Sequence, residues 1–407
     1  MKKGFDIEML YDVTIIGAGA SGMMSGIIAS GNGKKVIIIE HREQPGKKIL
    51  ATGNGRCNYS NINQLADNYH CKNKDFVEDV LNQFSQKEMT KFLNENGMLT
   101  KEKNGYLYPR SNQAASIRDF LVSLLEKNGV RIMLNTECSD IKKDDDIFNV
   151  VCSGNIIKSR SVIVSTGGMT YKKTGSDGSG YKLLEKMGHT IIPPLPALTA
   201  LYCKEKIFKE LKGIRLDGKI ELYVDDTKVS EDTGEIQLTD YGVSGIPVFQ
   251  VSRFAAISLY QKRKVTASVD FLPEIDKKKL NELLYGNDLN IRQKLYGMVN
   301  KKLADVILKH TGIDGNMSIY DVKNKQLKIL TDTLKNLHIT VYATGDYEHA
   351  QVVTGGVDIN EIHSNTMESK KIKNLYLTGE VMDVDGLCGG YNLQWAWSTG
   401  YIAGTNC

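Results

Sequence analysis

The most restrictive feature of this 407-residue sequence is a glycine-rich turn between a short apolar strand and a helix. Residues 12–16 are predicted to form a buried strand, which runs into Gly-Ala-Gly-Ala-Ser-Gly at positions 17–22. A helix is predicted from Ala20 to about Gly31, and a second strand over residues 35–40 ends in an acid, Glu40. Strand, G-x-G-x-x-G, helix, strand and terminal acid in this order predict a dinucleotide-binding βαβ unit.

Each part of this unit has a physical reason. Gly17 permits the tight turn, Gly19 lets a pyrophosphate approach the backbone, and Gly22 allows the helix to pack closely on the strand. The diphosphate would lie at the helix N-terminus, where free N–H groups carry about half a positive charge. Glu40 is placed to bind a ribose hydroxyl, and an acid at this position disfavours the 2′-phosphate of NADP.

Three later features favour FAD over NAD. Residues 161–165 form a predicted apolar strand that ends in Thr-Gly-Gly, a pattern common in two-dinucleotide-binding flavoproteins. Residues 374–377 form another, followed by Gly379 and Glu380, which suit ribityl hydroxyls and phosphate. Residues 389–396 are typical of a helix start, whose N–H groups can point at the flavin N1–C2=O edge. An NAD-binding domain needs no closing strand and helix so far along the chain, whereas FAD is long enough to need both.

A polar loop over residues 44–58 follows the first unit. It contains three glycines, two asparagines and three cations, which leaves little apolar surface for a core. Such a segment is either mobile or wrapped around a polar ligand. We expect Lys48, Asn54, Arg56 and Asn58 to supply donors to the flavin or the diphosphate. Cys57 has no histidine beside it, so it is expected to be a packed small side chain rather than a nucleophile.

Several of these runs together resemble one bacterial flavoprotein family. The runs are GAGASG, GKKILATGNGRCN, STGGMTYKKTGSDGSGY with MGHTIIPPLPALTAL, and TGGVDINEI with TMESKKIKNLYLTGEVMDVDGLCGGYNLQWAW. The chain resembles the FAD-binding aminoacetone oxidase family, which includes bile-acid enone reductase-like proteins. The resemblance implies a discontinuous FAD domain that is interrupted by a β-rich insert and a small helical piece. Membership of such a family implies cofactor and fold more firmly than it implies the reaction.

The motifs and this resemblance together give a set of residues that we expect to bind the cofactor. They are Gly17, Ala18, Gly19, Ala20, Ser21, Gly22, Glu40, His41, Lys48, Gly53, Asn54, Arg56, Cys57, Asn58, Cys138, Thr166, Gly167, Gly168, Gly379, Glu380, Gly390, Tyr391, Asn392 and Leu393.

The predicted fold class is α/β, with a Rossmann-like FAD-binding domain interrupted by a β-barrel-like insert and a helical subdomain. The FAD domain is expected at residues 1–192 and 341–407, the insert at 193–272 and the helical subdomain at 273–340. Three prolines between positions 193 and 196 mark the first boundary. Short alternating strands are predicted at 200–203, 219–224, 234–238 and 264–270. Apolar residues spaced by three and four then predict helices; they are Leu280, Leu283, Leu284, Ile291, Leu295, Val299, Leu303, Val306 and Ile307.

Composition excludes several other classes of protein. No run of 18 or more apolar residues exists, so a transmembrane protein is not expected, and the start of the chain lacks the pattern of a signal peptide. The net charge is only +4 and no basic stripe is evident, which weighs against a nucleic-acid partner. Seven cysteines without a CxxC pair, and no clustered histidines, favour reduced thiols in a cytoplasmic protein without a metal site.

The expected function is that of an FAD-dependent oxidoreductase that moves a hydride between a small organic substrate and flavin N5. An NAD(P)H-linked reductase of an activated C=C bond is favoured. An amine oxidase using O₂ and a flavin-bearing regulatory or RNA-modifying protein remain as alternatives. Residues 175–180 are glycine-rich but lie too close to residue 168 to form a second nucleotide domain, so NAD(P)H would have to enter through the substrate pocket.

The sequence identifies no catalytic acid or base. Tyr108 and Tyr391 are candidates, although a core aromatic residue with a satisfied hydroxyl is the favoured interpretation of each. Cys388 lies near the predicted C-terminal flavin contacts, where a covalent link to the flavin is conceivable.

Overall fold

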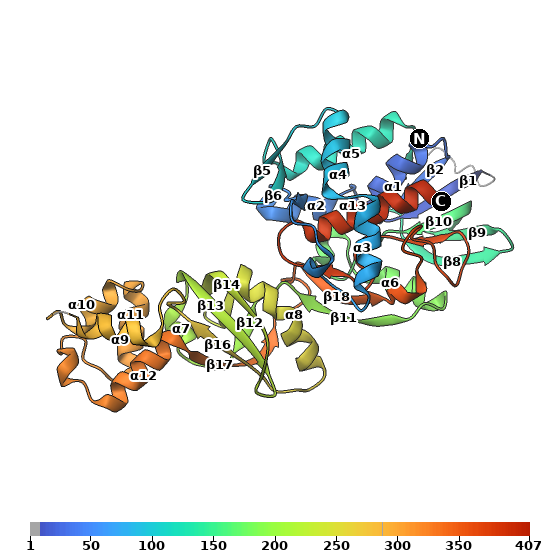
Figure 1. Ribbon diagram of the computed structural model, residues 1–407. Coiled ribbons are helices and arrows are strands. Elements are labelled where there is room, and N and C mark those ends of the chain that lie inside the picture. The colour runs from blue at the N-terminus through green and yellow to red at the C-terminus, as the bar shows by residue number, and fades with distance from the viewer. Residues whose placement is uncertain (1–8, 287) are drawn as a thin grey trace. The chain divides into compact units, whose positions relative to one another are not determined.

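The computed structural model describes residues 9–286 and 288–407, so residues 1–8, where no signal peptide is expected, lie outside the described part. The chain folds into two compact units (Figure 1). Unit 1 contains the chain up to Pro194 and from Val352 onward, and unit 2 contains Leu195–Gln351. The domain organisation is therefore discontinuous, with one long insertion in a Rossmann-like unit.

Unit 1 is built on a mixed seven-stranded sheet. Its order is β7-β2-β1-β10-β9-β8, with β19 beside β10. The strands are β1 (Leu10–Ile16), β2 (Val36–Ile39), β7 (Arg131–Met133), β8 (Cys138–Asp144), β9 (Ile147–Cys152), β10 (Asn155–Val164) and β19 (Leu375–Leu377). β7, β2, β1, β10 and β19 run parallel, whereas β9 is antiparallel to both β8 and β10. The central strands β2 and β19 are short apolar runs that are buried throughout, as expected where both faces of a parallel sheet are covered.

Two helices far apart in sequence lie side by side in unit 1 (Figure 1). They are α1 (Ala20–Gly31) and α13 (Tyr391–Asn406). A Cβ atom at Gly400 would lie 2.5 Å from the Ser21 carbonyl oxygen, and one at Gly404 would lie 2.6 Å from that of Ser25. The Ser25 hydroxyl donates to the Gly400 carbonyl at 3.0 Å. Small residues on both helices thus permit a close backbone approach.

The remaining elements of unit 1 cover or extend this sheet. They are α2 (Lys47–Ala51), β3 (Ser60–Asn61), β4 (Tyr69–His70), α3 (Lys74–Gln83), α4 (Gln86–Glu95), β5 (Thr100–Lys103), β6 (Tyr106–Pro109), α5 (Ala114–Lys127), α6 (Ser179–Lys186), β18 (Val352–Val357) and β20 (Asp385–Gly386). β18 pairs with β11 (Ile191–Ala197), which leads the chain into unit 2.

Unit 2 contains a closed six-stranded barrel in the order β12-β15-β14-β13-β16-β17. Its strands are β12 (Leu201–Cys203), β13 (Arg215–Val224), β14 (Thr227–Leu238), β15 (Gly242–Gly245), β16 (Val265–Asp270) and β17 (Leu337–Thr344). Each pair of neighbouring strands in the barrel is antiparallel. Alternate residues such as Ile220 and Leu222 are completely buried, as expected where one face of each strand lines a core. The predicted barrel-like insert is therefore confirmed. The helices α7 (Phe208–Leu211) and α8 (Ile246–Tyr260) belong to the same unit.

The helical part of unit 2 contains α9 (Lys277–Tyr285), α10 (Ile291–Tyr296), α11 (Lys301–Thr311) and α12 (Asn324–Lys335). Most of the predicted apolar stripe is buried in the core of this unit. Leu283 differs, because its side chain is 40% exposed and points away from the packed face that Leu280 and Leu284 occupy. The adjacent Leu284 occupies the core instead, and a pattern of apolar residues spaced by three or four does not show which of two adjacent leucines is buried.

The second boundary of the insertion lies later than residue 341, where the sequence pattern put it. β17 pairs with β12 and β16 and closes the barrel. Leu337, Ile339 and Val341 are buried on its inner side, while His338 and Tyr342 point to the other side and are exposed. The chain therefore returns to unit 1 only at Val352.

A buried polar network in unit 1 surrounds His189, whose side chain is completely buried. Its Nδ1 lies 2.8 Å from the Glu361 carboxylate and its Nε2 lies 3.0 Å from the Ser369 hydroxyl. Burial lowers the pKa of His189, against the raising effect of Glu361. Burial raises the pKa of Glu361, but hydrogen bonds from Lys371, Thr190 and His189 outweigh it and lower that pKa to about 2.

We expect acid to destabilise the protein through this network. The pKa of Glu361 is about 2 in the folded chain against an ordinary 4.5, so its stabilising effect is complete above pH 4.5 and is lost as the pH falls towards 2. Replacing Glu361 by Gln should lower the free energy of unfolding at neutral pH by roughly 2–3 kcal/mol and flatten its decline on acidification. Urea unfolding of both proteins across this pH range measures the effect. Parallel pH profiles for the two proteins would contradict the assignment.

Candidate functional site

The carboxyl ends of four parallel strands of unit 1 meet at one edge of the sheet. The Gly17 N–H donates to the Ile39 carbonyl at 2.8 Å, which joins the ends of β1 and β2. The Ser165 and Thr378 hydroxyls lie 2.6 Å apart and join the ends of β10 and β19. Ligands of open α/β sheets bind at this edge, outside the carboxyl ends of the strands. The three glycine-bearing turns predicted from the sequence therefore lie together.

The three glycines of the G-x-G-x-x-G motif have different surroundings. A Cβ atom at Gly17 would lie 2.5 Å from the Ser165 carbonyl oxygen, and one at Gly22 would lie 2.0 Å from the Gly17 carbonyl oxygen. Both glycines are therefore required by the protein's own packing. A Cβ atom at Gly19 would meet no protein atom within 4 Å. Space is thus open in front of Gly19, which caps the N-terminus of α1 without any side-chain cap.

Glu40 follows β2 and is almost buried, at 8% exposure. One carboxylate oxygen accepts the Ala18 N–H at 2.9 Å, and the other accepts the Arg42 N–H at 2.8 Å. These bonds fix the carboxylate beside the glycine turn and leave further lone pairs for a ribose hydroxyl. The adjacent His41 ring lies 3.8 Å from Glu40.

Cys138 lies near the carboxyl end of β2, because the segment just before it is hydrogen-bonded to the residue that follows β2. The Thr136 N–H, two residues before it, donates to the Glu40 carbonyl at 2.9 Å. The Cys138 side chain itself is buried opposite Cys152 on the neighbouring strand, and its contact with that thiol raises the pKa of Cys138. A cofactor contact at Cys138 would therefore have to come from its backbone.

Lys48 reaches a carboxylate far along the chain. Its Nζ lies 2.8 Å from Glu380 and 2.8 Å from the Thr170 hydroxyl. Glu380 also accepts the backbone N–H groups of Gly168 at 3.3 Å and Val353 at 3.1 Å. The proposed cofactor residues Lys48, Gly168 and Glu380 are thus brought together. Their charged groups bond to each other, so their first role is to hold the turns in place.

The polar loop after β2 is partly helical. Lys47–Ala51 forms α2, and Gly53 and Asn54 adopt the left-handed conformation in the turn that follows. Asn54 and Arg56 are exposed, and the Arg56 guanidinium lies 5.8 Å from the centre of the Tyr108 ring. Cys57 is fully buried, and burial raises its pKa to about 12, which agrees with a packed thiol rather than a nucleophile.

The N-terminus of α13 lies against this loop. Gly390 caps the helix without a side-chain cap, and no acid occupies the first turn. A Cβ atom at Gly390 would lie 2.9 Å from Oδ1 of Asn58, a buried oxygen without a hydrogen-bond partner among the described residues. The Asn392 side chain bonds the backbone N–H and C=O of Gly386, at 2.8 and 2.9 Å, and shapes the turn before the helix. Its backbone, with those of Tyr391 and Leu393, supplies the free N–H groups of the first turn.

The residues at this edge fit an FAD molecule. Two helices of unit 1, α1 and α13, present uncapped N-termini, which favour the diphosphate and the electron-rich edge of the ring. Open space lies at Gly19, and Glu40 stands at the end of β2. Thr166 Oγ1 and Asn58 Oδ1 are buried without partners in the described chain, and a bound polar molecule would satisfy them.

The catalytic candidates have no geometry that selects one of them. Tyr391 is 7% exposed, and burial raises its pKa, while Tyr108 is half-buried beside Arg56. Cys388 is partly exposed and free of any disulfide. No cluster of three metal-ligating side chains occurs in the described part of the chain. Within residues 9–286 and 288–407, no helix is long and apolar enough to cross a bilayer.

Sequence reasoning missed several residues that shape this edge. Thr170 holds Lys48, and Ser165 and Thr378 join two strand ends. The signal was present for the last pair, because each directly follows an apolar parallel strand and precedes a Gly-containing turn. Thr170 carries no comparable signal, since its partner is 122 residues away.

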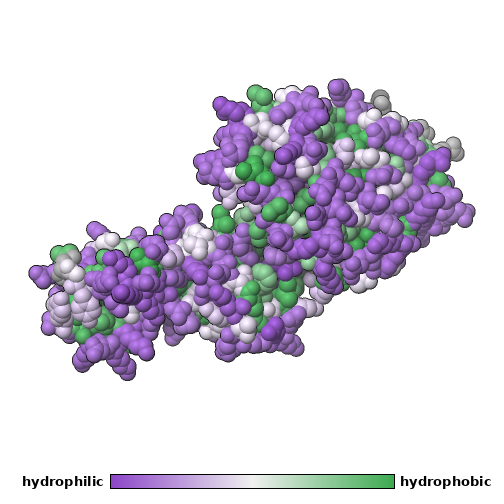
Figure 2. All heavy atoms as spheres, in the orientation of Figure 1, coloured by the Kyte–Doolittle hydropathy of each residue, from purple (hydrophilic) through white to green (hydrophobic). Residues whose placement is uncertain are grey.

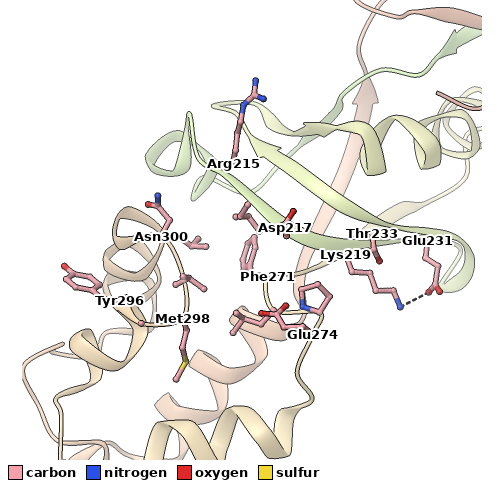
Figure 3. Close-up of a pocket in the computed structure, with 16 residues that line it drawn as sticks. Arg215, Asp217, Lys219, Glu231, Thr233, Phe271, Glu274, Tyr296, Met298 and Asn300 are labelled. Atoms are coloured by element: carbon pink, nitrogen blue, oxygen red, sulfur yellow. Dashed lines mark ion pairs between the residues drawn. The ribbon is translucent and has the colours of Figure 1, made fainter. Parts of the chain in front are cut away.

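Two other features of the molecule have some of the properties of a site. His189 stands between Glu361 and Ser369 in the order of a hydrolytic triad, but Ser369 is 4% exposed and its hydroxyl accepts the N–H groups of Lys371 and Ile372. Unit 2 holds a hollow of about 930 Å³ between the barrel and the helices (Figure 3). Its labelled charges include the Lys219–Glu231 ion pair, at 2.9 Å, so no charge of one sign dominates it. In the face shown in Figure 2 the hydrophobic residues are scattered among hydrophilic ones.

The chain is similar to known proteins over nearly its full length. A sequence model described as the HI0933-like protein Rossmann domain matches residues 11–406. Over 400 residues, which are 96% of this chain and 98% of the relative, the chain is 40% identical to the 3-dehydro-bile acid delta(4,6)-reductase of Clostridium scindens. Over 397 residues, 96% of each chain, it is 31% identical to the ribosomal RNA dihydrouridine synthase of Escherichia coli.

A solved structure has a similar fold. The 3-ketosteroid-Δ4-(5α)-dehydrogenase of Rhodococcus jostii RHA1, solved with 4-androstene-3,17-dione, superposes with a TM-score of 0.51 over 99% of this chain and 98% of that one. The sequence identity is 14%, so this likeness concerns the fold alone.

Proposed function

This chain belongs to the HI0933-like family of flavoenzyme oxidoreductases, and from that premise we propose that it is an FAD-dependent reductase of a C=C bond conjugated to a carbonyl group. The observation that carries the proposal is the 40% identity, across nearly the full length of both chains, to a reductase of a 3-dehydro-bile acid. We propose a small-molecule substrate of the same chemical class, a flat-ringed enone.

The names of the two relatives describe one kind of bond. A delta(4,6) double-bond system beside a 3-keto group is conjugated to that ketone. Uridine becomes dihydrouridine when the ring double bond conjugated to a carbonyl is reduced. In both cases the carbonyl withdraws electrons, so that hydride can add to the far carbon of the double bond. Shared chemistry therefore supports conjugate reduction, whichever molecule carries the bond.

The residues of unit 1 have separate roles in this proposal. FAD, when bound and reduced by the nicotinamide, would supply the hydride for the far carbon of the double bond, and a proton must reach the carbon next to the carbonyl to complete the reduction. The N-terminus of α1 and the space at Gly19 would hold its diphosphate, and Glu40 its ribose. The first-turn N–H groups of α13 would stabilise negative charge on the reduced ring. The Lys48–Glu380 pair would keep the turns after β10 and β19 at a fixed separation.

Anaerobic half-reactions test this function. We expect NADH or NADPH to bleach the visible flavin absorbance of the purified holoenzyme, and a 3-keto steroid with conjugated double bonds to restore it with formation of the reduced steroid. A small primary amine should leave the oxidised spectrum unchanged. Bleaching by the amine, with peroxide release in air, would instead indicate the oxidase alternative. An unchanged spectrum with both nicotinamides would contradict the proposed donor.

An RNA substrate is the second outcome to be tested, because a relative at 31% identity is named for ribosomal RNA. The expectation of no nucleic-acid partner rests on the small net charge of +4 and stays a prediction. The same reduced holoenzyme should be mixed with unmodified ribosomal RNA. Formation of dihydrouridine without steroid reduction would overturn the small-molecule proposal.

A further inference from the structure

A short segment that follows β10 lies against the chain that follows β2. It covers residues 169–178, between β10 and α6, and we call it the strap. The Thr170 hydroxyl accepts a hydrogen bond from Lys48 Nζ at 2.8 Å. Two residues later, the Lys172 carbonyl accepts one from Nη2 of Arg42 at 2.6 Å. The strap is therefore held at two points by residues that come shortly after β2 in the sequence.

The middle of the strap lies beside the carboxylate that is proposed to bind ribose. A Cβ atom at Gly175 would lie 3.3 Å from Cγ of Arg42 and 3.3 Å from the His41 ring. These two residues directly follow Glu40, and the Arg42 N–H donates to the Glu40 carboxylate at 2.8 Å. The same arginine thus contacts the ribose acid through its backbone and the strap through its side chain.

The backbone of the strap turns sharply at three positions. Tyr171, Gly175 and Gly178 adopt the left-handed conformation, with φ values of 56°, 114° and 81°. The Gly178 N–H donates to the Gly168 carbonyl at 3.1 Å and brings the strap back to the end of β10. Glycines at the two later turns allow the backbone to change conformation there at little steric cost. The strap is thus a loop that is closed at its base and held in its middle by side chains.

Two buried polar atoms beside the strap have no hydrogen-bond partner among the described residues. One is Nε of Arg42, on the same guanidinium that holds the Lys172 carbonyl. The other is Oγ1 of Thr166, which lies under the start of α6, since a Cβ atom at Gly180 would approach it to 1.9 Å. Buried donors and acceptors are seldom left unpaired. These two atoms therefore indicate a polar ligand between the strap and the strand ends.

The side chains of the strap favour a sugar or a phosphate over an apolar ring. Thr170 and Ser176 are buried, at 0% and 7% exposure, whereas Lys172 and Lys173 are exposed. The inner side of the strap thus carries hydroxyl groups and the outer side carries charge. Hydroxyls can bond to the ribose and phosphate oxygens of a nucleotide. FAD has a ribose and a diphosphate in its adenosine half, which is the half proposed to lie at Glu40.

We propose that the strap closes over the adenosine half of bound FAD, and that FAD is released only after the bond between Arg42 and the Lys172 carbonyl breaks. The inference rests on the FAD site of the proposed function, but it does not depend on the substrate. It adds a third segment to the glycine turn and the acid that bind the same half of the cofactor. Opening of the strap then sets the rate at which FAD leaves.

Limited proteolysis with trypsin tests where the strap lies. Lys172 and Lys173 are exposed trypsin sites, and cleavage after them requires the strap to leave its contacts and enter the protease. We expect FAD to slow this cleavage about tenfold relative to the apoprotein, as followed by mass spectrometry. Lys127, exposed at the end of α5, is the internal control. Its neighbour Asn128 bonds the Ser30 hydroxyl at 3.1 Å, near the opposite end of α1 from the glycine turn, so cleavage after Lys127 should not respond to FAD.

Two fragments of the cofactor decide which half the strap covers. ADP, which shares the adenosine diphosphate, should protect Lys172 and Lys173 when it is added at a concentration that displaces FAD. FMN, which carries the flavin ring without adenosine, should not protect them. The inference is overturned if FAD leaves the rate of cleavage unchanged, if FMN protects as well as FAD does, or if ADP displaces FAD without protection.

The release of FAD gives a second measurement. Arg42→Met removes the side-chain bond to the strap and should raise the dissociation rate of FAD about tenfold, as measured by the fluorescence of the released flavin. Arg160→Met is the control, because Arg160 is an exposed arginine of β10 that lies 3.8 Å from Asp12, and it should leave the rate unchanged. Equal rates for Arg42→Met and the wild type overturn the inference. A holoenzyme that shows the expected protection and release but reduces no enone contradicts the proposed function alone.

Discussion

Gly19→Val is expected to give a folded protein that holds little or no flavin. A Cβ atom at this position would meet no protein atom within 4 Å, so the native chain has room for the new side chain. The same space lies at the uncapped N-terminus of α1, where the diphosphate of the cofactor is proposed to approach the backbone. A valine there would keep the phosphate from the helix N–H groups. We expect the affinity for FAD to fall at least 100-fold, on the order of 3 kcal/mol or more.

The ratio of flavin to protein absorbance after purification, and FAD titration of the apoprotein, measure this effect. Far-ultraviolet circular dichroism should be unchanged. Gly31→Val is the matched control: Gly31 belongs to the same helix, and a Cβ there also meets no atom within 4 Å. That variant should remain yellow. A yellow, fully loaded Gly19→Val protein would show that the phosphates do not approach this turn.

Gly22→Ala, in contrast to Gly19→Val, is expected to prevent stable folding of the protein itself. A Cβ atom at Gly22 would lie 2.0 Å from the Gly17 carbonyl oxygen and 3.1 Å from Cβ of Ser165. The first contact is with backbone, which cannot rotate away as a flexible side chain can. Relief of this clash would require α1 to move away from the ends of β1 and β10. That movement would also break the contact between α1 and α13. We expect a loss of more than about 3 kcal/mol, a large part of the stability of a typical domain.

Soluble yield and urea unfolding of the apoprotein measure this loss, with Gly31→Ala as the control that should be neutral or slightly stabilising. Adding FAD should not rescue Gly22→Ala, because the clash exists within the protein. Together, Gly19 and Gly22 separate cofactor binding from folding at two positions three residues apart. An apoprotein of Gly22→Ala as stable as the wild type would contradict the close packing at this turn.

The parallel strands of unit 1 could be predicted because their signal is local. Strands such as β2 and β10 read as short β-branched runs, and the turns that follow them contain glycine where the backbone is crowded. The family resemblance implied the order of the insertions, and the match over residues 11–406 confirms membership of the family. Fold and flavin chemistry were accessible from the sequence for these reasons.

The parts that were missed depend on contacts between distant residues. Lys48 bonds Glu380, 332 residues away, and no local pattern in the sequence predicts that pairing, while its expected contact with the cofactor stays a prediction. Likewise, β17 belongs to the barrel because it pairs with β12 and β16. The alternation of buried and exposed residues along β17 does not by itself show to which unit the strand belongs.

The close crossing of α1 and α13 has a consequence for biosynthesis. The Ser25 hydroxyl of α1 donates to the carbonyl of Gly400, which the ribosome adds 375 residues later. During most of translation the small-residue face of α1 therefore has no native partner, and unit 2 can fold before unit 1 is complete. A premature stop codon shortly before α13 would leave an otherwise nearly full-length product without its closing helix, and the small-residue face of α1 would have no native partner.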